Sequence, residues 1–237
     1  MGSASQIEWT DATWGPTRGC SVASPGCEHC YAAGIAARFS GPGLPYEGFA
    51  KRSAKRGLPQ WTGKLQLIEH ALPLPLSWRQ PRRIFVNSMS DLFHEAVSDR
   101  EIAAVFGVMS LGCHHTYQIL TKRADRMADV VSRLTLEMCA DAVADYAIPL
   151  PRAQRRATLA ALPPDSPFRP ESNAPLWPLP NVHLGVSIEN QKYADERIPF
   201  LLDTPAAVRF ISAEPLLGPV RLNLKHWHDH AALPCGV

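Results

Sequence analysis

The chain has 237 residues, 46% of them hydrophobic and 19% charged, and its formal net charge at pH 7 is +2. This composition is typical of a folded globular protein, excludes a disordered chain, and gives no global charge argument for nucleic-acid binding. No apolar run is long enough to cross a bilayer, and the N-terminus lacks the charged-then-apolar pattern of a secretion signal. We therefore expect one domain over residues 1–237, with no membrane partner.

Three cysteines near the N-terminus form the main motif. Cys20, Cys27 and Cys30 make a C-x6-C-x2-C run, which Tyr31 follows directly. An odd number of clustered thiols cannot pair off as disulfides, so the run predicts a metal or cluster site in a loop over 15–31. Structural zinc nearly always takes four protein ligands, whereas an iron–sulfur cube held by three cysteines leaves one iron open. Thiols that bind metal rather than cross-link indicate a reducing, cytoplasmic location.

The cysteine loop is flanked by aromatic residues, a helix and a basic segment. Trp9 and Trp14 precede it and either shield a cluster from solvent or simply pack in an N-terminal strand. Residues 31–39 favour a helix that starts at the last cysteine. The Gly- and Pro-rich stretch 40–63 carries Lys51, Arg52, Lys55 and Arg56. These basic residues form either a lip for an anionic substrate or a plain solvated loop.

Beyond residue 63 short apolar strands alternate with amphipathic helices. Strands are predicted at 64–67, 83–87, 117–120, 182–186 and 208–211, and helices at 99–111, 124–134, 136–147 and 191–202. A further helical segment is predicted at 69–78, broken by Pro73 and Pro75. Ser98 and Glu101 have the spacing of a helix-starting capping box. This alternation predicts βαβ units and a parallel sheet, that is, an α/β fold. A Pro-rich section at about 135–180 interrupts the alternation, and we interpret it as an insertion or lid.

Polar motifs follow four of the predicted strands: N-S-M-S-D, T-K-R, S-I-E-N and S-A-E-P. In parallel α/β folds the functional residues lie just beyond the carboxyl ends of the strands. We therefore expect these four ends to converge on one face and form a binding site. The side chains offered there are Ser88, Asp91, Lys122, Ser187, Glu189, Ser212 and Glu214.

Taken together, the motifs resemble one family. They are W-T-D-A-T-W-G-P-x-x-G-C-x6-C-x2-C-Y, F-V-N-S-M-S-D-L-F, I-L-T-K-R, L-G-V-S-I-E-N-Q and F-I-S-A-E-P-L-L-G. In this order, from about residue 7 to residue 222, they are similar to the phage Gp37/Gp68 family, DUF5131, a family of unknown function with radical-SAM-like features. No substrate is defined for that family.

The resemblance implies a partial or complete TIM-like barrel of the radical SAM type. Cys20, Cys27 and Cys30 would hold a [4Fe-4S] cluster, with S-adenosylmethionine (SAM) on the open iron. The polar residues at the strand ends would bind SAM or substrate, with Lys122 suited to the SAM carboxylate, and no catalytic residue is assigned. The resemblance also implies an electron donor such as flavodoxin or ferredoxin.

The sequence departs from the radical SAM and family patterns in three places. Its cysteine spacing is C-x6-C-x2-C rather than the usual radical SAM C-x3-C-x2-C, and Gly15 stands where family members commonly carry Asn. The chain also ends at Val237, before a further strand and a Gly-Gly-Glu-Ser segment that family members usually have. This last difference predicts an open barrel and an inactive or incomplete site.

Two other functions remain open from the residues alone. His29 could complete a Cys3His zinc site, which would make the protein a non-catalytic zinc-binding module. Basic residues at 51–64 and 152–156 could instead bind DNA or RNA in a phage-derived nucleic-acid-binding protein.

Overall fold

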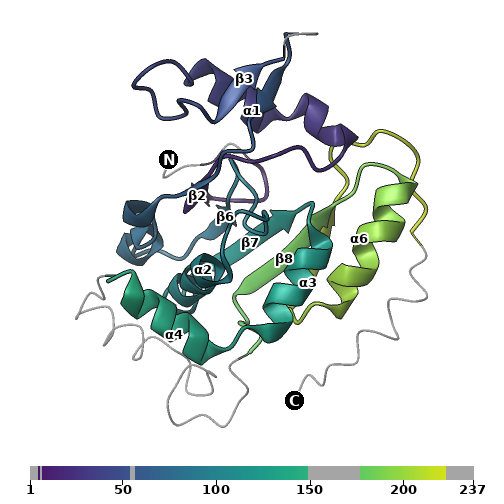
Figure 1. Ribbon diagram of the computed structural model, residues 1–237. Coiled ribbons are helices and arrows are strands. Elements are labelled where there is room, and N and C mark those ends of the chain that lie inside the picture. Colours follow the sequence, from purple (N-terminus) through teal and green to yellow (C-terminus); the bar gives the residue numbers. More distant parts are fainter. Residues whose placement is uncertain (1–4, 6, 54–56, 149–176, 223–237) are drawn as a thin grey trace.

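The computed structural model of the chain describes residues 5, 7–53, 57–148 and 177–222. Its centre is a parallel sheet of five strands in the order β1-β6-β7-β8-β9 (Figure 1). The strands are β1 (Ala12–Trp14), β6 (Arg83–Val86), β7 (Thr116–Thr121), β8 (Val182–Ser187) and β9 (Val208–Ser212). The predicted α/β fold with a parallel sheet is confirmed. Within the described ranges β1 and β9 each pair with one strand only, so the sheet is open rather than closed into a barrel.

Helices α2 (Asp99–Leu111), α3 (Ala124–Arg133) and α6 (Gln191–Asp203) lie on one face of this sheet (Figure 1). Helix α4 (Leu136–Asp145) packs on α2. In β7 the burial alternates, with Tyr117 and Ile119 fully buried on the helix side and Gln118 and Leu120 half-buried on the other side. One face of the sheet is thus the hydrophobic core, and the opposite face is only partly covered.

The local signals in the sequence explain two of the helices. The capping box of α2 forms as predicted, because the Ser98 hydroxyl accepts from the Glu101 amide while the Glu101 carboxylate accepts from the Ser98 amide at 2.6 Å. Helix α4 packs on α2 where Gly107 has no side chain, since a Cβ there would lie 2.4 Å from Val143. Cys139 is buried at this crossing, as expected for a small core residue.

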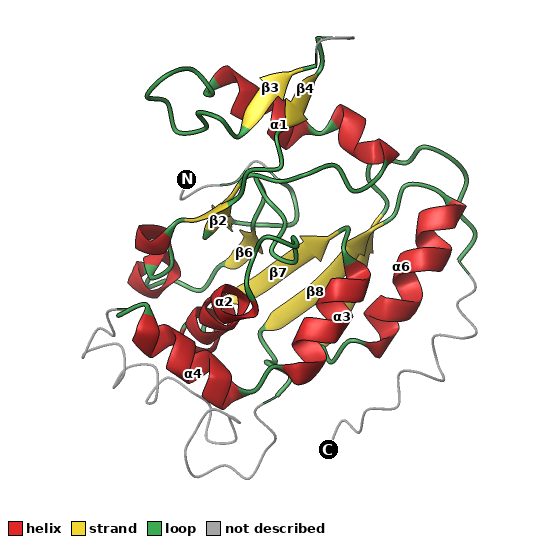
Figure 2. Cartoon of the chain, viewed as in Figure 1, coloured by secondary structure: helices red, strands yellow, loops and turns green. Residues whose placement is uncertain are grey.

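A second, smaller core lies above the carboxyl ends of the strands (Figure 2). Helix α1 (Tyr31–Arg38) packs there on an antiparallel ribbon of β3 (Ala50–Arg52) and β4 (Pro59–Trp61), and we call these three elements the cap. Its buried side chains include Ala33, Ala36, Phe49 and Trp61. The antiparallel pair β2 (Thr17–Arg18) and β5 (Gln66–Leu67) joins the segments on either side of the cap.

Several predicted elements differ from the structure. The stretch 40–63, expected as a loop, contains β3 and β4, and the strand expected at 64–67 is reduced to β5. The helical segment at 69–78 is broken near its prolines, as expected, but its two parts are 3-10 turns, η2 (Glu69–Ala71) and η3 (Leu74–Ser77). Prolines at 73 and 75 lack the amide hydrogens that a continuous helix needs.

The predicted insertion at 135–180 begins with α4, and most of its remainder, residues 149–176, lies outside the described part of the chain. No helix in the described ranges combines the length and the apolar composition needed to cross a membrane.

Candidate functional site

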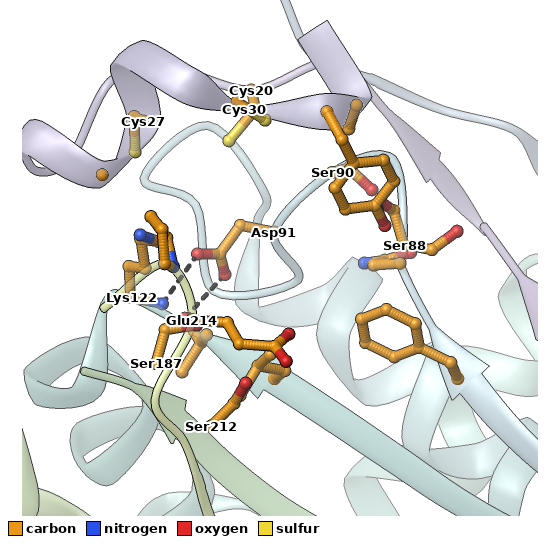
Figure 3. A pocket seen from close by; sticks show the side chains of 18 of the residues that line it. Cys20, Cys27, Cys30, Ser88, Ser90, Asp91, Lys122, Ser187, Ser212 and Glu214 are labelled. Carbon is orange, nitrogen blue, oxygen red and sulfur yellow. Dashed lines mark hydrogen bonds between the residues drawn. The ribbon is translucent and has the colours of Figure 1, made fainter. Parts of the chain in front are cut away.

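A cavity of about 530 Å³ lies between the cap and the carboxyl ends of the strands. All three clustered cysteines line it, together with residues from the ends of β6, β7, β8 and β9. In Figure 3 the cysteines occupy one side of the cavity, and Lys122, Ser187, Ser212 and Glu214 lie on the opposite side. Of the ten predicted site residues, nine line the cavity: Cys20, Cys27, Cys30, Ser88, Asp91, Lys122, Ser187, Ser212 and Glu214.

The cysteine loop is shaped by a short 3-10 helix, η1 (Pro25–His29). The Cys27 amide donates to the carbonyl of Ser24 at 2.9 Å, and the Cys30 amide donates to the carbonyl of Cys27 at 3.3 Å. Cys30 is also the residue at which α1 begins. The loop expected at 15–31 therefore contains a helical turn, which brings the last two cysteines to the cavity wall.

The first cysteine is fixed by the glycine before it. Gly19 has φ +95°, and a Cβ at this position would lie 2.0 Å from the carbonyl oxygen of Lys64. Only glycine meets both demands. The carbonyl of Cys20 in turn accepts from the Gly63 amide at 3.2 Å, so the backbone on both sides of the cap holds this thiol in place.

The three thiols share the cavity without forming the tight group of a single-ion site. Among the described residues, no set of three or more His, Cys, Asp or Glu side chains is close enough to hold one metal ion. Three cysteine thiols lining one cavity are a donor set that suits soft metals, which include both zinc and the irons of an iron–sulfur cube.

Burial changes the acidity of one of these thiols. Desolvation, followed by the negative charge of Asp91, raises the pKa of Cys20 to about 12, against the opposing effect of Arg123. Cys20 is therefore protonated at neutral pH in the metal-free protein. A metal or cluster bound there must displace this proton, since the thiolate is the ligand.

Glu189 is the one predicted site residue behind the cavity wall. It is fully buried, and its Oε1 accepts from Ser24 Oγ at 2.5 Å and forms an ion pair with Lys122. Arg197 Nη1 lies 3.7 Å from the same oxygen. Burial alone would raise the pKa of Glu189, but the hydrogen bonds from Lys122 and Ser24 and the two positive charges hold it below its usual value. A Cβ on Gly26 would meet this carboxylate at 2.7 Å, so the cysteine loop packs directly on it.

Asp91 also has an internal role. Its Oδ1 accepts from the Phe93 amide at 3.0 Å and from Thr121 Oγ1 at 2.7 Å. Its Oδ2 accepts from the Lys122 amide at 3.2 Å and from Arg123 Nη1 at 3.1 Å. These four contacts tie the loop after β6 to the end of β7 and occupy the carboxylate.

The other predicted polar residues are available to a ligand. Within the described ranges, no hydrogen bond involves the side chains of Ser88, Ser187, Ser212 or Glu214, and all four residues line the cavity. The Ser88 carbonyl accepts from the hydroxyl of Tyr31 at 2.9 Å, which joins α1 to the end of β6.

The two tryptophans before the cysteines have different surroundings. Trp9 lines the cavity and its ring contacts that of Phe85 at a tilt of 58°, with 4.8 Å between ring centroids. Trp14 is fully buried on the helix side of the sheet, where its Nε1 donates to the Ala71 carbonyl at 2.7 Å. Only Trp9 is placed to cover a group bound in the cavity.

The sequence analysis missed a polar cluster beside Cys20. Ser21 Oγ accepts from Arg123 Nη2 at 2.7 Å and lies 2.8 Å from His94 Nε2. Burial, followed by the charge of Arg123, lowers the pKa of His94. Because Ser21 and His94 are 73 positions apart and belong to no common motif, only the folded chain brings them together.

No curated protein and no solved structure is significantly similar to this chain. One family model, described as "Protein of unknown function (DUF5131)", matches residues 4–231. The match includes the cysteine loop, the cap and the ends of all the strands that form the cavity. The chain therefore belongs to the DUF5131 family.

Proposed function

We propose that the protein is a radical SAM enzyme, with a [4Fe-4S] cluster on Cys20, Cys27 and Cys30 and SAM in the adjoining cavity. The observation that carries this proposal is that one wall of the cavity holds the three cysteines and the opposite wall holds the polar strand ends. The volume of about 530 Å³ also lies in the range of small-molecule sites. The same proposal includes a partial barrel of the TIM type and the phage Gp37/Gp68 assignment.

The cofactors would supply the chemistry, and the chain would bind and orient them. Bound beside each other, the two groups would supply one-electron reductive cleavage of a sulfonium and removal of a hydrogen atom from a substrate, and Cys20, Cys27 and Cys30 would hold the cluster for it. Ser187 and Ser212 offer hydroxyls for the ribose or amino-acid part of SAM, and Glu214 offers a carboxylate for its amine. Trp9 and Phe85 provide an apolar wall suited to a base.

The proposal assigns Lys122 and Glu189 a supporting role. Each already has the other as its ion-pair partner, so neither is free to bind SAM without breaking that pair. They hold the cysteine loop against the end of β8 instead. This differs from the expectation that both contact SAM, and it leaves Ser88, Ser187, Ser212 and Glu214 as the proposed cofactor-binding residues.

The reaction also requires an outside source of one electron, for which we propose flavodoxin or ferredoxin in the cytoplasm. Residues 17–64 carry seven Lys or Arg and two Asp or Glu, a net charge of +5 in a chain whose total is +2. Lys51 and Arg52 are exposed on β3, while Lys55 and Arg56 lie outside the described residues. A positive surface of this kind suits an acidic partner and, as the second candidate, a nucleic acid.

Anaerobic purification and reconstitution with iron and sulfide test the proposal. The wild-type protein should carry about four irons per chain, bind SAM, and release 5′-deoxyadenosine when reduced with dithionite. Cys30→Ala should lose the iron, while Cys113→Ala, which removes a thiol outside the cavity, should keep it. A colourless protein that holds one zinc through Cys30, or an iron-loaded protein that does not bind SAM, would contradict the proposal.

A further inference from the structure

Ser21, His94 and Glu95 are arranged like a nucleophilic triad. Ser21 Oγ lies 2.8 Å from His94 Nε2, and Glu95 Oε2 lies 3.4 Å from His94 Nδ1. Ser21 lines the cavity directly after Cys20. In a hydrolase triad the histidine accepts the serine proton at Nε2, which requires the hydrogen of the ring to be on Nδ1.

A backbone hydrogen bond to His94 excludes a hydrogen on Nδ1 in the neutral ring. The amide of Ala96 donates to His94 Nδ1 at 3.0 Å, so Nδ1 is an acceptor and carries no hydrogen. In a neutral imidazole the hydrogen is then on Nε2, which donates to Ser21 Oγ. The contact between Glu95 and Nδ1 is the weaker of the two, since the Glu95 side chain is 70% exposed and the contact would require a hydrogen on Nδ1. His94 cannot act as a base toward Ser21.

The hydroxyl of Ser21 has a hydrogen without an acceptor among the described residues. A hydroxyl oxygen has two acceptor sites and one hydrogen to donate. His94 Nε2 and Arg123 Nη2 occupy both acceptor sites, at 2.8 Å and 2.7 Å. In the part of the chain that the structure describes, the Ser21 hydroxyl donates to no acceptor. Its hydrogen is thus a fixed, unused donor at the cavity wall.

The cation behind this hydroxyl increases its strength as a donor. Arg123 is buried and is itself held by Asp91 at 3.1 Å and by Glu95 at 3.1 Å, so its guanidinium keeps one orientation. A hydroxyl that accepts from a charged donor is polarised and donates more strongly in turn.

We propose that the Ser21 hydroxyl donates a hydrogen bond to the anionic sulfur group held by the three cysteines, as a positioning residue that Arg123 and His94 orient. This inference rests on the proposed function. Hydrogen bonds to the sulfurs of a cluster stabilise its more negative, reduced form and raise its reduction potential. Ser21 would thereby bring the cluster closer to the potential of its electron donor.

The test compares reduction potentials of the reconstituted protein and three variants. Ser21→Ala, which removes the donor, should shift the potential of the cluster to a more negative value. Ser21→Thr keeps a hydroxyl and should stay near the wild type. Ser90→Ala is the matched control, because Ser90 lines the same cavity but its hydroxyl already donates to the Thr17 carbonyl at 3.0 Å. Iron content and thermal melting are measured on every variant.

Pulsed EPR of the reduced wild type gives a second readout that does not depend on Ser21→Ala folding. Hydroxyl hydrogens exchange with D₂O far faster than buried amides, so brief transfer should introduce a deuteron coupled to the cluster, in the wild type and in Ser21→Thr. Three outcomes would each overturn this inference and leave the proposed function standing. They are an unchanged potential in Ser21→Ala with full iron content, a Ser21→Thr variant that shifts like Ser21→Ala, and the absence of a coupled deuteron. A wild-type protein that binds no iron would overturn the proposed function and this inference with it.

Discussion

Ser24 Oγ donates a hydrogen bond of 2.5 Å to Oε1 of Glu189, across 165 positions of the sequence. Ser24 precedes η1, and Glu189 follows β8. The same carboxylate pairs with Lys122 at the end of β7. The loop that carries the cysteines is therefore attached to two strand ends through one buried carboxylate.

Replacing this carboxylate should destabilise the fold. Glu189→Gln leaves the side chain of Lys122 and that of Arg197 with no negative partner in a buried setting, and we expect a loss of about 3 kcal/mol in the free energy of unfolding. Urea denaturation measures this loss, and hydrogen exchange of residues 24–30 should become faster. Asp129→Asn, which breaks the exposed pair with Arg133, is the control and should leave stability unchanged. A loss no larger than the control's would show that Glu189 does not anchor the loop.

Gly19 should tolerate no side chain. Gly19→Ala combines φ +95° with a Cβ 2.0 Å from a backbone oxygen, so we expect at least about 3 kcal/mol of destabilisation. Gly43→Ala is the matched control, because φ is +73° there and nothing lies within 4 Å of its Cβ, and it should cost about 1 kcal/mol. Equal midpoints of chemical unfolding for the two variants would refute the role of the close contact with Lys64.

Stability should fall as the pH decreases from 6.5 to 4. Burial, followed by the charge of His114, lowers the pKa of His115 from 6.5 to about 4, and its Nε2 lies 3.1 Å from the Pro75 carbonyl oxygen. Between these pH values the unfolded chain binds more protons than the folded one, so the free energy of unfolding rises with pH, by at most about 3 kcal/mol from this group. His94 and His183, whose pKa values burial also lowers, act in the same direction.

Replacing His115 checks the sign and size of this effect. Unfolding curves at several pH values should show a smaller slope for His115→Asn than for the wild type. An equal slope in both proteins would assign the acid sensitivity to other groups.

The thiol of Cys20 should react slowly in the metal-free protein. With its pKa raised to about 12, Cys20 has little thiolate at pH 8, and its alkylation by iodoacetamide should be roughly a hundredfold or more slower than that of a free cysteine. Mass spectrometry of the peptide that contains Cys20 measures the rate. The rate should keep rising above pH 10. A plateau near pH 9 would mean that burial and Asp91 do not control this thiol.

The sequence predicted the sheet because its signals are local. Each strand from β6 to β9 is a short apolar run, and Ser98 and Glu101 set the start of α2 within four positions. The convergence of the polar strand ends followed from the rule for parallel sheets, and the cavity contains residues from each end. The helix of the cap was predicted at 31–39 and forms as α1. The ribbon of the cap was not predicted, because β3 and β4 have three residues each and lie among glycines and prolines that also fit a loop.

The orientation of the site residues depended on partners distant in the sequence. Glu189 and Ser187 are both near the end of β8, yet one is buried against Ser24 and the other faces the cavity. Their positions near a strand end could not show which side chain is buried and which faces the cavity, because the partner that buries Glu189, Ser24, belongs to the distant cysteine loop. The proposed donor role of Ser21 depends in the same way on His94 and Arg123, which lie in the segments that follow β6 and β7.

The small core of the cap has a consequence for how a cluster would be lost. Six buried residues form that core, against the much larger one under the sheet, and Cys20 and Cys30 pack at its edge. A unit with so few apolar contacts opens at a lower free energy than the whole domain. A cluster held by Cys20 and Cys30 would therefore be lost through brief partial opening of α1 and its ribbon, at a rate that follows the stability of this small unit rather than the melting temperature of the protein.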